Sequence, residues 1–252
     1  MKALIVAGNR GTRLAPFTKV LPKPLIPLGD YPVLEIILCQ LREAGFAEIT
    51  LVVNYLAELF EAYFGSGERL GIDIRYLREE TPLGTAGSLD ALRSVDEPLL
   101  VMSADVLTDL DFQALYLAHT ARDAALTMAL YEREYKVEFG VIDTDANGRV
   151  TRCREKPTLS FLVDTGVYVV SPAVFRHIPC NQYCDMPDVI DLLRRVGAPI
   201  YGYPFSGQWL DLSKADNFDR VVAQFQYLSA VAETQVPLEA YVRFLSSIQV
   251  EA

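Results

Sequence analysis

The chain has 252 residues, of which 51% are hydrophobic and 22% are charged. This is enough apolar material for a sizeable buried core, and it excludes intrinsic disorder. The formal net charge is −10, so the surface repels nucleic acid and anionic lipid, and both are excluded as partners. The first apolar run, residues 3–7, is too short for a signal peptide, and no run of 18 apolar residues follows. We therefore expect a cytoplasmic protein without a membrane span.

The cysteines give no sign of a metal or disulfide framework. None of the four, Cys39, Cys153, Cys180 and Cys184, has CxxC spacing with another. Free thiols in a reducing compartment are the expected state, in preference to a zinc site.

Strand and helix patterns alternate through the first half of the chain. Apolar runs predict strands at 3–7, 48–55, 72–77, 98–105 and 125–132. Helical spacing of apolar residues predicts helices at 33–45, 56–65, 86–95 and 111–122. Strands separated by helices imply right-handed crossovers and a mainly parallel sheet.

The second half of the chain has a mixed pattern. Asn147 and Gly148 lie between two short strands and indicate a hairpin within residues 140–155. Strands follow at 161–171 and 199–205, and helices at 186–197, 214–228 and 236–248. The sequence predicts an α/β fold with a mainly parallel, mixed sheet flanked by helices. We expect one domain over 1–230 and a helical tail over 231–252. The apolar stretch YVRFLSSIQV of this tail is a candidate homodimer contact, and the sequence leaves the oligomeric state open.

A basic, glycine-rich loop follows the first strand. It lies in the sequence IVAGNRGTRLAPFTKVLPKP, residues 5–24. Gly8 and Gly11 allow backbone N–H groups to face a phosphate, Thr12 adds a hydroxyl, and Arg13 and Lys23 add charge. Neither a P-loop nor a G-x-G-x-x-G motif is present. Prolines on both sides of Lys23 predict an extended backbone that holds this lysine on a stiff support.

This loop resembles the signature of the sugar-nucleotide pyrophosphorylases, A-G-G-x-G-T-R-L-x-P-x-T-x-x-x-P-K-P-L. Residues 7–25 match it, with Asn9 in place of a glycine. Further family motifs follow in order: PLGTAGSL from Pro82, SADVLTD from Ser103, FGV from Phe139, EKP from Glu155, DTGVYVVSP from Asp164 and WLDLS from Trp209. The resemblance spans about residues 1–227 and implies a Rossmann-like nucleotidyltransferase fold. It also implies the reaction of an NTP with a sugar 1-phosphate, which gives an NDP-sugar and pyrophosphate.

The resemblance assigns roles to individual positions. Arg13, Lys23 and Asp105 are implied as catalytic residues, and Asp105 and Asp211 as ligands of Mg²⁺, the expected cofactor. The implied nucleotide-binding residues are Ala7, Gly8, Asn9, Gly11, Thr12, Leu83, Gly84 and Gly87. The implied sugar-phosphate-binding residues are Gly140, Glu155, Lys156, Asp164 and Thr165.

Several site positions depart from the family pattern. These are Asn9, Ala104, Asp164 and Ser213. They leave open a non-catalytic, regulatory homologue, and a cytidylyltransferase acting on another phosphate such as phosphocholine is a further alternative. Intact Asp105, Lys156 and Asp211 favour an enzyme over the first, and the EKP and TGVY motifs favour a sugar substrate over the second. The PLGTAG motif resembles mannose-1-phosphate guanylyltransferases and favours GTP, whereas the sugar is not readable.

Overall fold

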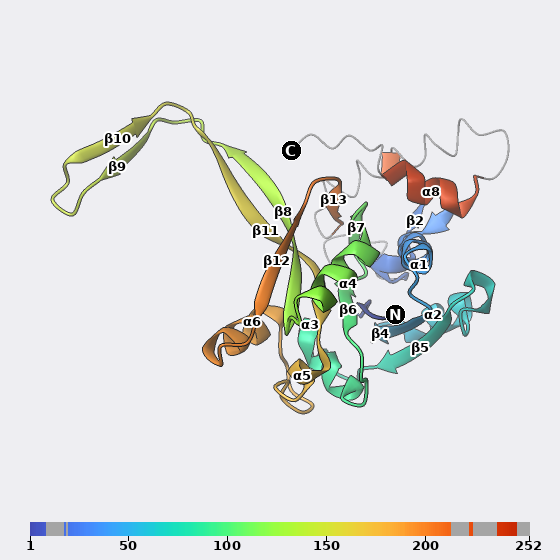
Figure 1. Cartoon of the computed structure of the whole chain (residues 1–252). Helices are drawn as coiled ribbons and strands as arrows, with labels where there is room; N and C mark the ends of the chain where they lie inside the picture. Colours follow the sequence, from blue (N-terminus) through green and yellow to red (C-terminus); the bar gives the residue numbers. More distant parts are fainter. Residues whose placement is uncertain (9–17, 19, 213–221, 224–235, 246–252) are drawn as a thin grey trace.

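A computed structural model describes residues 1–8, 18, 20–212, 222–223 and 236–245 of the chain. Its centre is a seven-stranded sheet in the order β12-β8-β11-β6-β1-β4-β5 (Figure 1). The strands are β1 (Lys2–Val6), β4 (Glu48–Val53), β5 (Asp73–Arg78), β6 (Leu99–Ser103), β8 (Leu126–Lys136), β11 (Thr158–Val170) and β12 (Ile200–Phe205). All neighbouring strands are parallel except β11, which is antiparallel to both β6 and β8. The predicted mainly parallel, mixed sheet is confirmed.

Helices cover both faces of this sheet, as the strand sequences require. In β1, Ala3 and Ile5 face one core cluster, whereas Leu4 and Val6 face the other. The first core lies under α1 (Val33–Glu43), α2 (Ala57–Phe64), α4 (Phe112–Ala121) and α8 (Leu238–Leu245). The second lies under the 3-10 helix η5 (Ser88–Leu92), α5 (Pro172–Phe175) and α6 (Met186–Arg195). Burial on both faces explains the continuous apolar strands of the sequence.

One helix prediction is wrong in type, and another lies mostly outside the described residues. The single helix expected at 86–95 is wrong in type: a four-residue helix, α3 (Gly84–Gly87), leads into η5. The cause is tertiary, because the Ala86 and Gly87 N–H groups both donate to the Cys184 carbonyl. The helix expected at 214–228 lies outside the described residues except for 222–223.

The C-terminal helix α8 packs against α1. Tyr241 is fully buried there, its hydroxyl accepts from the Asp30 N–H at 2.9 Å, and its ring meets that of Tyr31 edge-on. The apolar residues of this helix are therefore used inside the chain.

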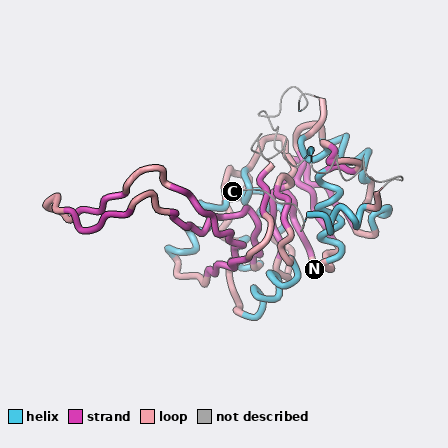
Figure 2. Tube along the Cα trace, turned by 90° about the horizontal axis from the view of Figure 1, so that it is seen from above, coloured by secondary structure: helices cyan, strands magenta, loops and turns pink. Residues whose placement is uncertain are grey.

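A long two-stranded arm projects from the body (Figures 1 and 2). It consists of the outer parts of β8 and β11 and the hairpin of β9 (Val141–Thr144) and β10 (Val150–Arg154). The hairpin predicted around Asn147 and Gly148 is confirmed, with Gly148 at φ +83°. We use "the arm" for residues 131–163.

The remaining elements are short. They are β2 (Pro27–Leu28), β3 (Tyr31–Pro32), β7 (Val106–Thr108), β13 (Trp209–Asp211) and the 3-10 turns η3 (Lys23–Leu25) and η4 (Glu68–Leu70). Among the described helices, none has the length and apolar character needed to cross a membrane.

Candidate active site

The candidate site lies where the central parallel strands end. β1 has β4 on one side and β6 on the other, so the chain reverses its direction of sheet growth at this point. The Ala7 N–H donates to Val52 O at 2.8 Å, and the Ala104 N–H donates to Val6 O at 3.0 Å. Ligands of open α/β sheets bind in the crevice beyond such a switch point.

Lys23 and Asp105 form an ion pair at this edge. Lys23 is 4% exposed, and its Nζ lies 2.8 Å from Asp105 Oδ2. Asp105 follows directly after β6, and its Oδ1 accepts from Ser103 Oγ at 2.6 Å. A buried ammonium is costly without a partner, so the fold holds both groups in one geometry.

The backbone around Lys23 differs from the extended form that its prolines predict. Pro22 is extended, at φ −57° and ψ 140°, but Lys23 begins the 3-10 turn η3. The turn closes with the Ile26 N–H on Lys23 O at 3.0 Å. Pro24 fits inside it because the first residues of a helical turn need no N–H donor. The extended prediction is wrong for Lys23, whereas its role as a supported cation at the site is compatible with the structure.

Asp211 lies beside Asp105, although 106 positions separate them in the chain. β13 pairs with β7 so that Asp211 is opposite Val106, and the Leu212 N–H donates to Asp105 O at 2.9 Å. The backbone pairing thus brings two carboxylate-bearing residues to neighbouring segments, and carboxylate oxygens are ligands that Mg²⁺ prefers. The residues present therefore fit the expected metal.

Another group of three possible ligands occurs elsewhere among the described residues. Cys39, Glu43 and Glu239 have ligand atoms within 4.8 Å of one another. The Arg42 guanidinium, however, already contacts Cys39 at 3.2 Å and Glu239 at 3.1 Å. Burial raises the pKa of the Cys39 thiol to about 12, against a smaller opposing effect of Arg42. A protonated thiol beside a cation is a poor metal ligand.

The loop of residues 83–87, which carries the predicted nucleotide-binding residues Leu83, Gly84 and Gly87, is hydrogen-bonded to residues 184–185. The Cys184 N–H donates to Leu83 O at 2.8 Å, and Asp185 Oδ1 accepts the Thr85 N–H at 3.0 Å. Gly84 has φ +82°, and a Cβ there would lie 2.5 Å from Cys184 O. Glycine is therefore required at Gly84 for both its conformation and its space. No sequence pattern indicates that this loop pairs with residues 184–185.

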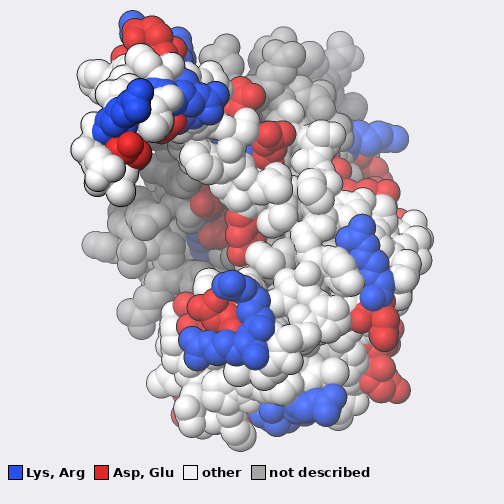
Figure 3. All heavy atoms as spheres, turned by 60° about the vertical axis from the view of Figure 1, so that its left-hand side comes forward, with Lys and Arg blue, Asp and Glu red and all other residues white. Residues whose placement is uncertain are grey.

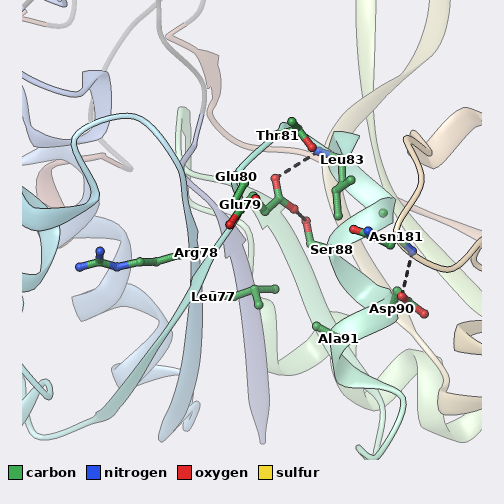
Figure 4. Close-up of a pocket in the computed structure, with 11 residues that line it drawn as sticks. Leu77, Arg78, Glu79, Glu80, Thr81, Leu83, Ser88, Asp90, Ala91 and Asn181 are labelled. Atoms are coloured by element: carbon green, nitrogen blue, oxygen red, sulfur yellow. Dashed lines mark hydrogen bonds between the residues drawn. The ribbon is translucent and has the colours of Figure 1, made fainter.

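A pocket of about 450 Å³ opens beside the same loop (Figure 4). Leu83 and Gly87 contribute to its wall, as does Glu79 at the end of β5. The Glu79 carboxylate accepts from Ser88 Oγ at 2.7 Å and from the Leu83 N–H at 3.2 Å. Glu79 is missing from the sequence-based assignment. It follows a parallel strand as Asp105 does, so the same rule would have found it.

The Gly8 position connects this pocket with the ion pair. A Cβ on Gly8 would lie 3.2 Å from Asn54 Cβ, and Asn54 Nδ2 donates to Glu79 O. Asp105, Gly8, Asn54 and Glu79 thus follow four adjacent strands along one edge of the sheet. Ala7, beside Gly8, is buried. Asn9, Gly11, Thr12 and Arg13 lie outside the described residues.

Two predicted sugar-side residues lie on β11 near the site. Thr165 is 2% exposed, its hydroxyl donates to Ala129 O at 2.8 Å, and its carbonyl accepts from Trp209 Nε1 at 3.1 Å. This contact links β11 to the strand that carries Asp211. Asp164 accepts from the Tyr168 hydroxyl at 2.6 Å, and burial, followed by the Asp164 charge, raises the pKa of Tyr168.

The other three sugar-side residues lie on the arm. Gly140, Glu155 and Lys156 are exposed, and a Cβ on Gly140 would lie 3.2 Å from Glu155 Oε2. Strand geometry puts the start of β11, at Thr158, about 20 Å from Asp164. The structure therefore brings Gly140 and Glu155 together but does not bring them or Lys156 to Asp105.

The comparisons with known proteins agree with this geometry. The family model "Nucleotidyl transferase" matches residues 2–226. The chain belongs to this family. It is 34% identical over 238 residues to a UTP–glucose-1-phosphate uridylyltransferase of Synechocystis, covering 86% of this chain and 61% of that protein. It is 32% identical over 261 residues to the mannose-1-phosphate guanylyltransferase catalytic subunit beta of Danio rerio, covering 100% of this chain and 71% of that protein.

The solved structures support the fold. A putative glucose-1-phosphate thymidylyltransferase from Bacillus anthracis matches with a TM-score of 0.72 and 22% identity, over 95% of this chain and 99% of that one. The family model and the two relatives confirm the resemblance drawn from the sequence motifs. The names of the relatives are those of sugar-1-phosphate nucleotidyltransferases, and they do not favour a regulatory homologue or a phosphocholine cytidylyltransferase.

Proposed function

We propose that this protein makes an NDP-sugar and pyrophosphate from an NTP and a sugar 1-phosphate. The observation that carries the proposal is the buried Lys23–Asp105 pair beside Asp211 at the switch point of the sheet. The activities in the names of the two relatives support the same reaction.

The reaction mainly requires that the two substrates be positioned and their negative charge neutralised. The sugar phosphate oxygen attacks the α-phosphorus while pyrophosphate leaves, so negative charge gathers between the two substrates. Asp105 and Asp211 would hold Mg²⁺, which supplies charge neutralisation when bound. Lys23 is held rigidly by η3 and donates its ammonium protons toward the phosphates. Gly8 lets the end of β1 approach Asn54 closely, because a side chain there would meet Asn54.

We infer that the nucleotide is GTP, from the chemistry of the pocket beside the 83–87 loop. Its charged lining residues are Arg78, Glu79, Glu80 and Asp90, and Arg78 points away from the pocket to bind Glu61 (Figure 4). An acidic pocket repels phosphate but accepts hydrogen bonds. Guanine offers two adjacent donors, N1–H and N2–H₂, whereas uracil and thymine offer one donor between two carbonyl oxygens. The Glu79 carboxylate matches the guanine edge.

Glu79→Gln tests this inference. An amide accepts one hydrogen bond and donates another, so it suits uracil or thymine better than guanine. We expect kcat/KM for GTP to fall by about one to two orders of magnitude, and the value for UTP or dTTP to rise relative to it. The measurement is pyrophosphate release with GTP, UTP, dTTP, CTP and ATP, each combined with a panel of sugar 1-phosphates.

Glu80→Gln is the matched control, since Glu80 lines the same pocket and the structure gives its carboxylate no hydrogen bond within the described residues. This variant should keep the wild-type order of nucleotides. An unchanged order in Glu79→Gln would contradict the choice of guanine without affecting the proposed reaction. Failure of the wild type to release pyrophosphate with any pair of substrates would contradict the reaction itself.

We propose that Lys156 binds the phosphate of the sugar, as the EKP motif implies. Lys156→Ala should then raise KM for the sugar 1-phosphate by about tenfold or more and leave KM for the nucleotide nearly unchanged. Lys136→Ala removes another exposed lysine of the same arm and serves as the control. Equal increases in both KM values would move Lys156 to the triphosphate.

We also propose a cytoplasmic reaction. All four cysteines are free, as expected in a reducing compartment.

A further inference from the structure

The segment between α5 and α6, residues 178–184, is held against the wall of the pocket that Figure 4 shows. At one end, the Arg93 guanidinium donates to Ile178 O at 2.6 Å. At the other end, the Gly87 N–H donates to Cys184 O at 3.0 Å. Gly87 and residues of η5 line the pocket, so the two contacts fix this segment at its edge.

Asn181, in the middle of this segment, has a left-handed backbone with φ +48°. Its N–H donates to Asp90 Oδ2 at 3.1 Å, and the Arg93 guanidinium donates to the other oxygen of that carboxylate. Glycine adopts this conformation without cost, whereas any side chain makes it less favourable, although asparagine tolerates it better than most residues do. The conformation alone therefore does not account for the carboxamide at this position.

The Asn181 carboxamide brings N–H donors to an acidic lining. Its side chain points from the segment toward Ser88 and the pocket (Figure 4), and it makes no hydrogen bond within the described part of the chain. The Ser88 hydroxyl donates its proton to Glu79 at 2.7 Å, and Arg78 points away to bind Glu61. An acceptor atom of a ligand in the pocket would therefore meet the Asn181 amide.

We propose that Asn181 selects the base of the nucleotide by donating to O6 of guanine. The inference rests on the proposed function, in which the Glu79 carboxylate accepts from guanine N1–H and N2–H₂. O6 is an acceptor and lies next to N1 on the same edge of the ring, so the pocket needs a donor beside the carboxylate. Adenine has an amino group in place of O6 and an acceptor at N1, so both contacts would reject it.

Glu79 and Asn181 are tied to the same short helix. Glu79 accepts from Ser88 Oγ, and the Asn181 backbone donates to Asp90 Oδ2. Ser88 and Asp90 both belong to η5. A 3-10 helix rises by about 2 Å per residue, so the two points of attachment are about 4 Å apart along η5. One base can therefore contact both side chains.

The surface charge does not select the nucleotide. On the face that Figure 3 shows, most Lys and Arg side chains of the described residues lie in small groups beside acidic ones. Such a surface cannot distinguish one nucleoside triphosphate from another, since all carry the same phosphates. The choice between bases has to come from polar contacts such as those of Glu79 and Asn181.

Asn181→Gly removes the carboxamide and keeps the backbone conformation. We expect the Kd of GTP to rise about tenfold, because O6 loses its hydrogen bond, while the urea midpoint of unfolding stays near that of the wild type. Calorimetric titration with nucleotide and Mg²⁺, without a sugar 1-phosphate, measures the Kd. Asp123→Gly is the control, since Asp123 has φ +47°, is exposed and does not line the pocket. This variant should bind GTP as the wild type does.

Two further nucleotides identify the atom that Asn181 contacts. Inosine triphosphate keeps O6 and lacks the N2 amino group, whereas the triphosphate of 2,6-diaminopurine riboside keeps that amino group and lacks O6. Asn181→Gly should weaken binding of the first as much as that of GTP and leave the second unchanged. Asn181→Asp keeps the shape of the side chain without a donor, so it should weaken GTP binding by at least about tenfold. It replaces Asn181→Gly if that variant does not fold.

Several outcomes would overturn this proposal. One is wild-type affinity for GTP in both Asn181 variants. Another is an equal loss of affinity for all three nucleotides, which would mean that Asn181 only shapes the pocket. A third is a wild type that binds the diaminopurine nucleotide as tightly as GTP. Pyrophosphate release from any NTP and a sugar 1-phosphate would leave the proposed reaction intact in each case, so the two proposals can fail separately.

Discussion

Asp105 shows how single side chains define the candidate site. Its carboxylate accepts hydrogen bonds from both Lys23 and Ser103. One oxygen is thus tied to the ammonium and the other to a hydroxyl, which orients the group toward the crevice. The charge of this carboxylate can therefore be removed with little change in shape.

Asp105→Asn should reduce turnover by about three orders of magnitude and lower the stability of the fold, because the buried Lys23 ammonium loses its counter-charge. Asparagine can still accept from Lys23, and its amide can donate to the Ser103 hydroxyl, which also accepts. The neutral amide, however, would lack the negative charge that holds Mg²⁺. The measurements are kcat over a range of Mg²⁺ concentrations and the melting temperature.

Asp111→Asn is the control for that substitution. Asp111 caps α4 by accepting the Ala114 N–H at 2.8 Å, and asparagine is an equally good cap. This variant should keep full activity. Turnover in Asp105→Asn close to that of Asp111→Asn would show that Asp105 has no part in metal binding.

At the scale of elements, the short helix α3 is shaped by its neighbour and not by its own sequence. The loop that leads into it is held by the Cys184 backbone and the Asp185 carboxylate. α6 follows directly, and Asp185 is its N-cap with a complete capping box. The cap of one helix thus fixes the loop that begins another.

Gly84→Ala should disturb nucleotide binding through this contact. Its Cβ would lie 2.5 Å from Cys184 O, so the loop must shift away from residues 184–185. We expect KM for the NTP to rise by about tenfold or more, with a stability loss of about 1–3 kcal/mol from the strained φ. Steady-state kinetics and urea unfolding measure the two effects.

Gly148→Ala tests the effect of backbone strain without the steric contact that Gly84→Ala creates. Gly148 has nearly the same φ, +83°, but a Cβ there meets nothing within 4 Å. This variant should show a stability loss of similar origin without the change in KM. Similar nucleotide KM values in both variants would contradict a role of the Gly84 contact in binding.

At the scale of the whole molecule, a buried histidine couples folding to pH. His119 is 1% exposed, and its ring nitrogens lie 3.0 Å from Thr127 Oγ1 and 3.0 Å from Ser171 Oγ. Ser171 donates its proton to Ala124 O at 2.6 Å, so it accepts from the ring. Burial lowers the pKa of His119 from 6.5 to about 4, against a smaller opposing effect of Asp123.

Stability should therefore fall as the pH falls from 6.5 toward 4. In this range the unfolded chain binds a proton at His119 that the folded chain excludes, so protonation favours unfolding. Above pH 6.5 His119 is neutral in both the folded and the unfolded chain and does not alter stability. Between pH 6.5 and pH 4 its protonation in the unfolded chain lowers the free energy of unfolding by about 3 kcal/mol. The measurement is the free energy of unfolding in urea as a function of pH.

His119→Gln should flatten this dependence, since glutamine does not titrate. His177→Gln, at an exposed position, should keep the wild-type slope. A wild-type slope in His119→Gln would show that other groups cause the acid sensitivity.

The sequence by itself determined the order and type of most elements and pointed to both members of the Lys23–Asp105 pair as candidate site residues. Continuous apolar strands and helical periodicity were enough for β1, β4, β5, β6 and α1, because burial on one or both faces leaves a repeat in the chain. The position of Asp105 could be predicted, because a carboxylate that follows a buried strand must lie at the edge of the sheet. The roles expected of the other site residues came from the family motifs.

Only the tertiary structure decided which distant residues meet. Glu35 is a charged residue within the apolar pattern of α1. It is fully buried, and its carboxylate binds Arg69 at 2.6 Å and accepts from the Tyr63 hydroxyl at 2.7 Å. The pairing of β13 with β7 and the hydrogen bonds of Cys184 with Leu83, Ala86 and Gly87 likewise join segments far apart in the chain. Such contacts leave no local periodicity, because their energy comes from partners that the chain supplies many residues away.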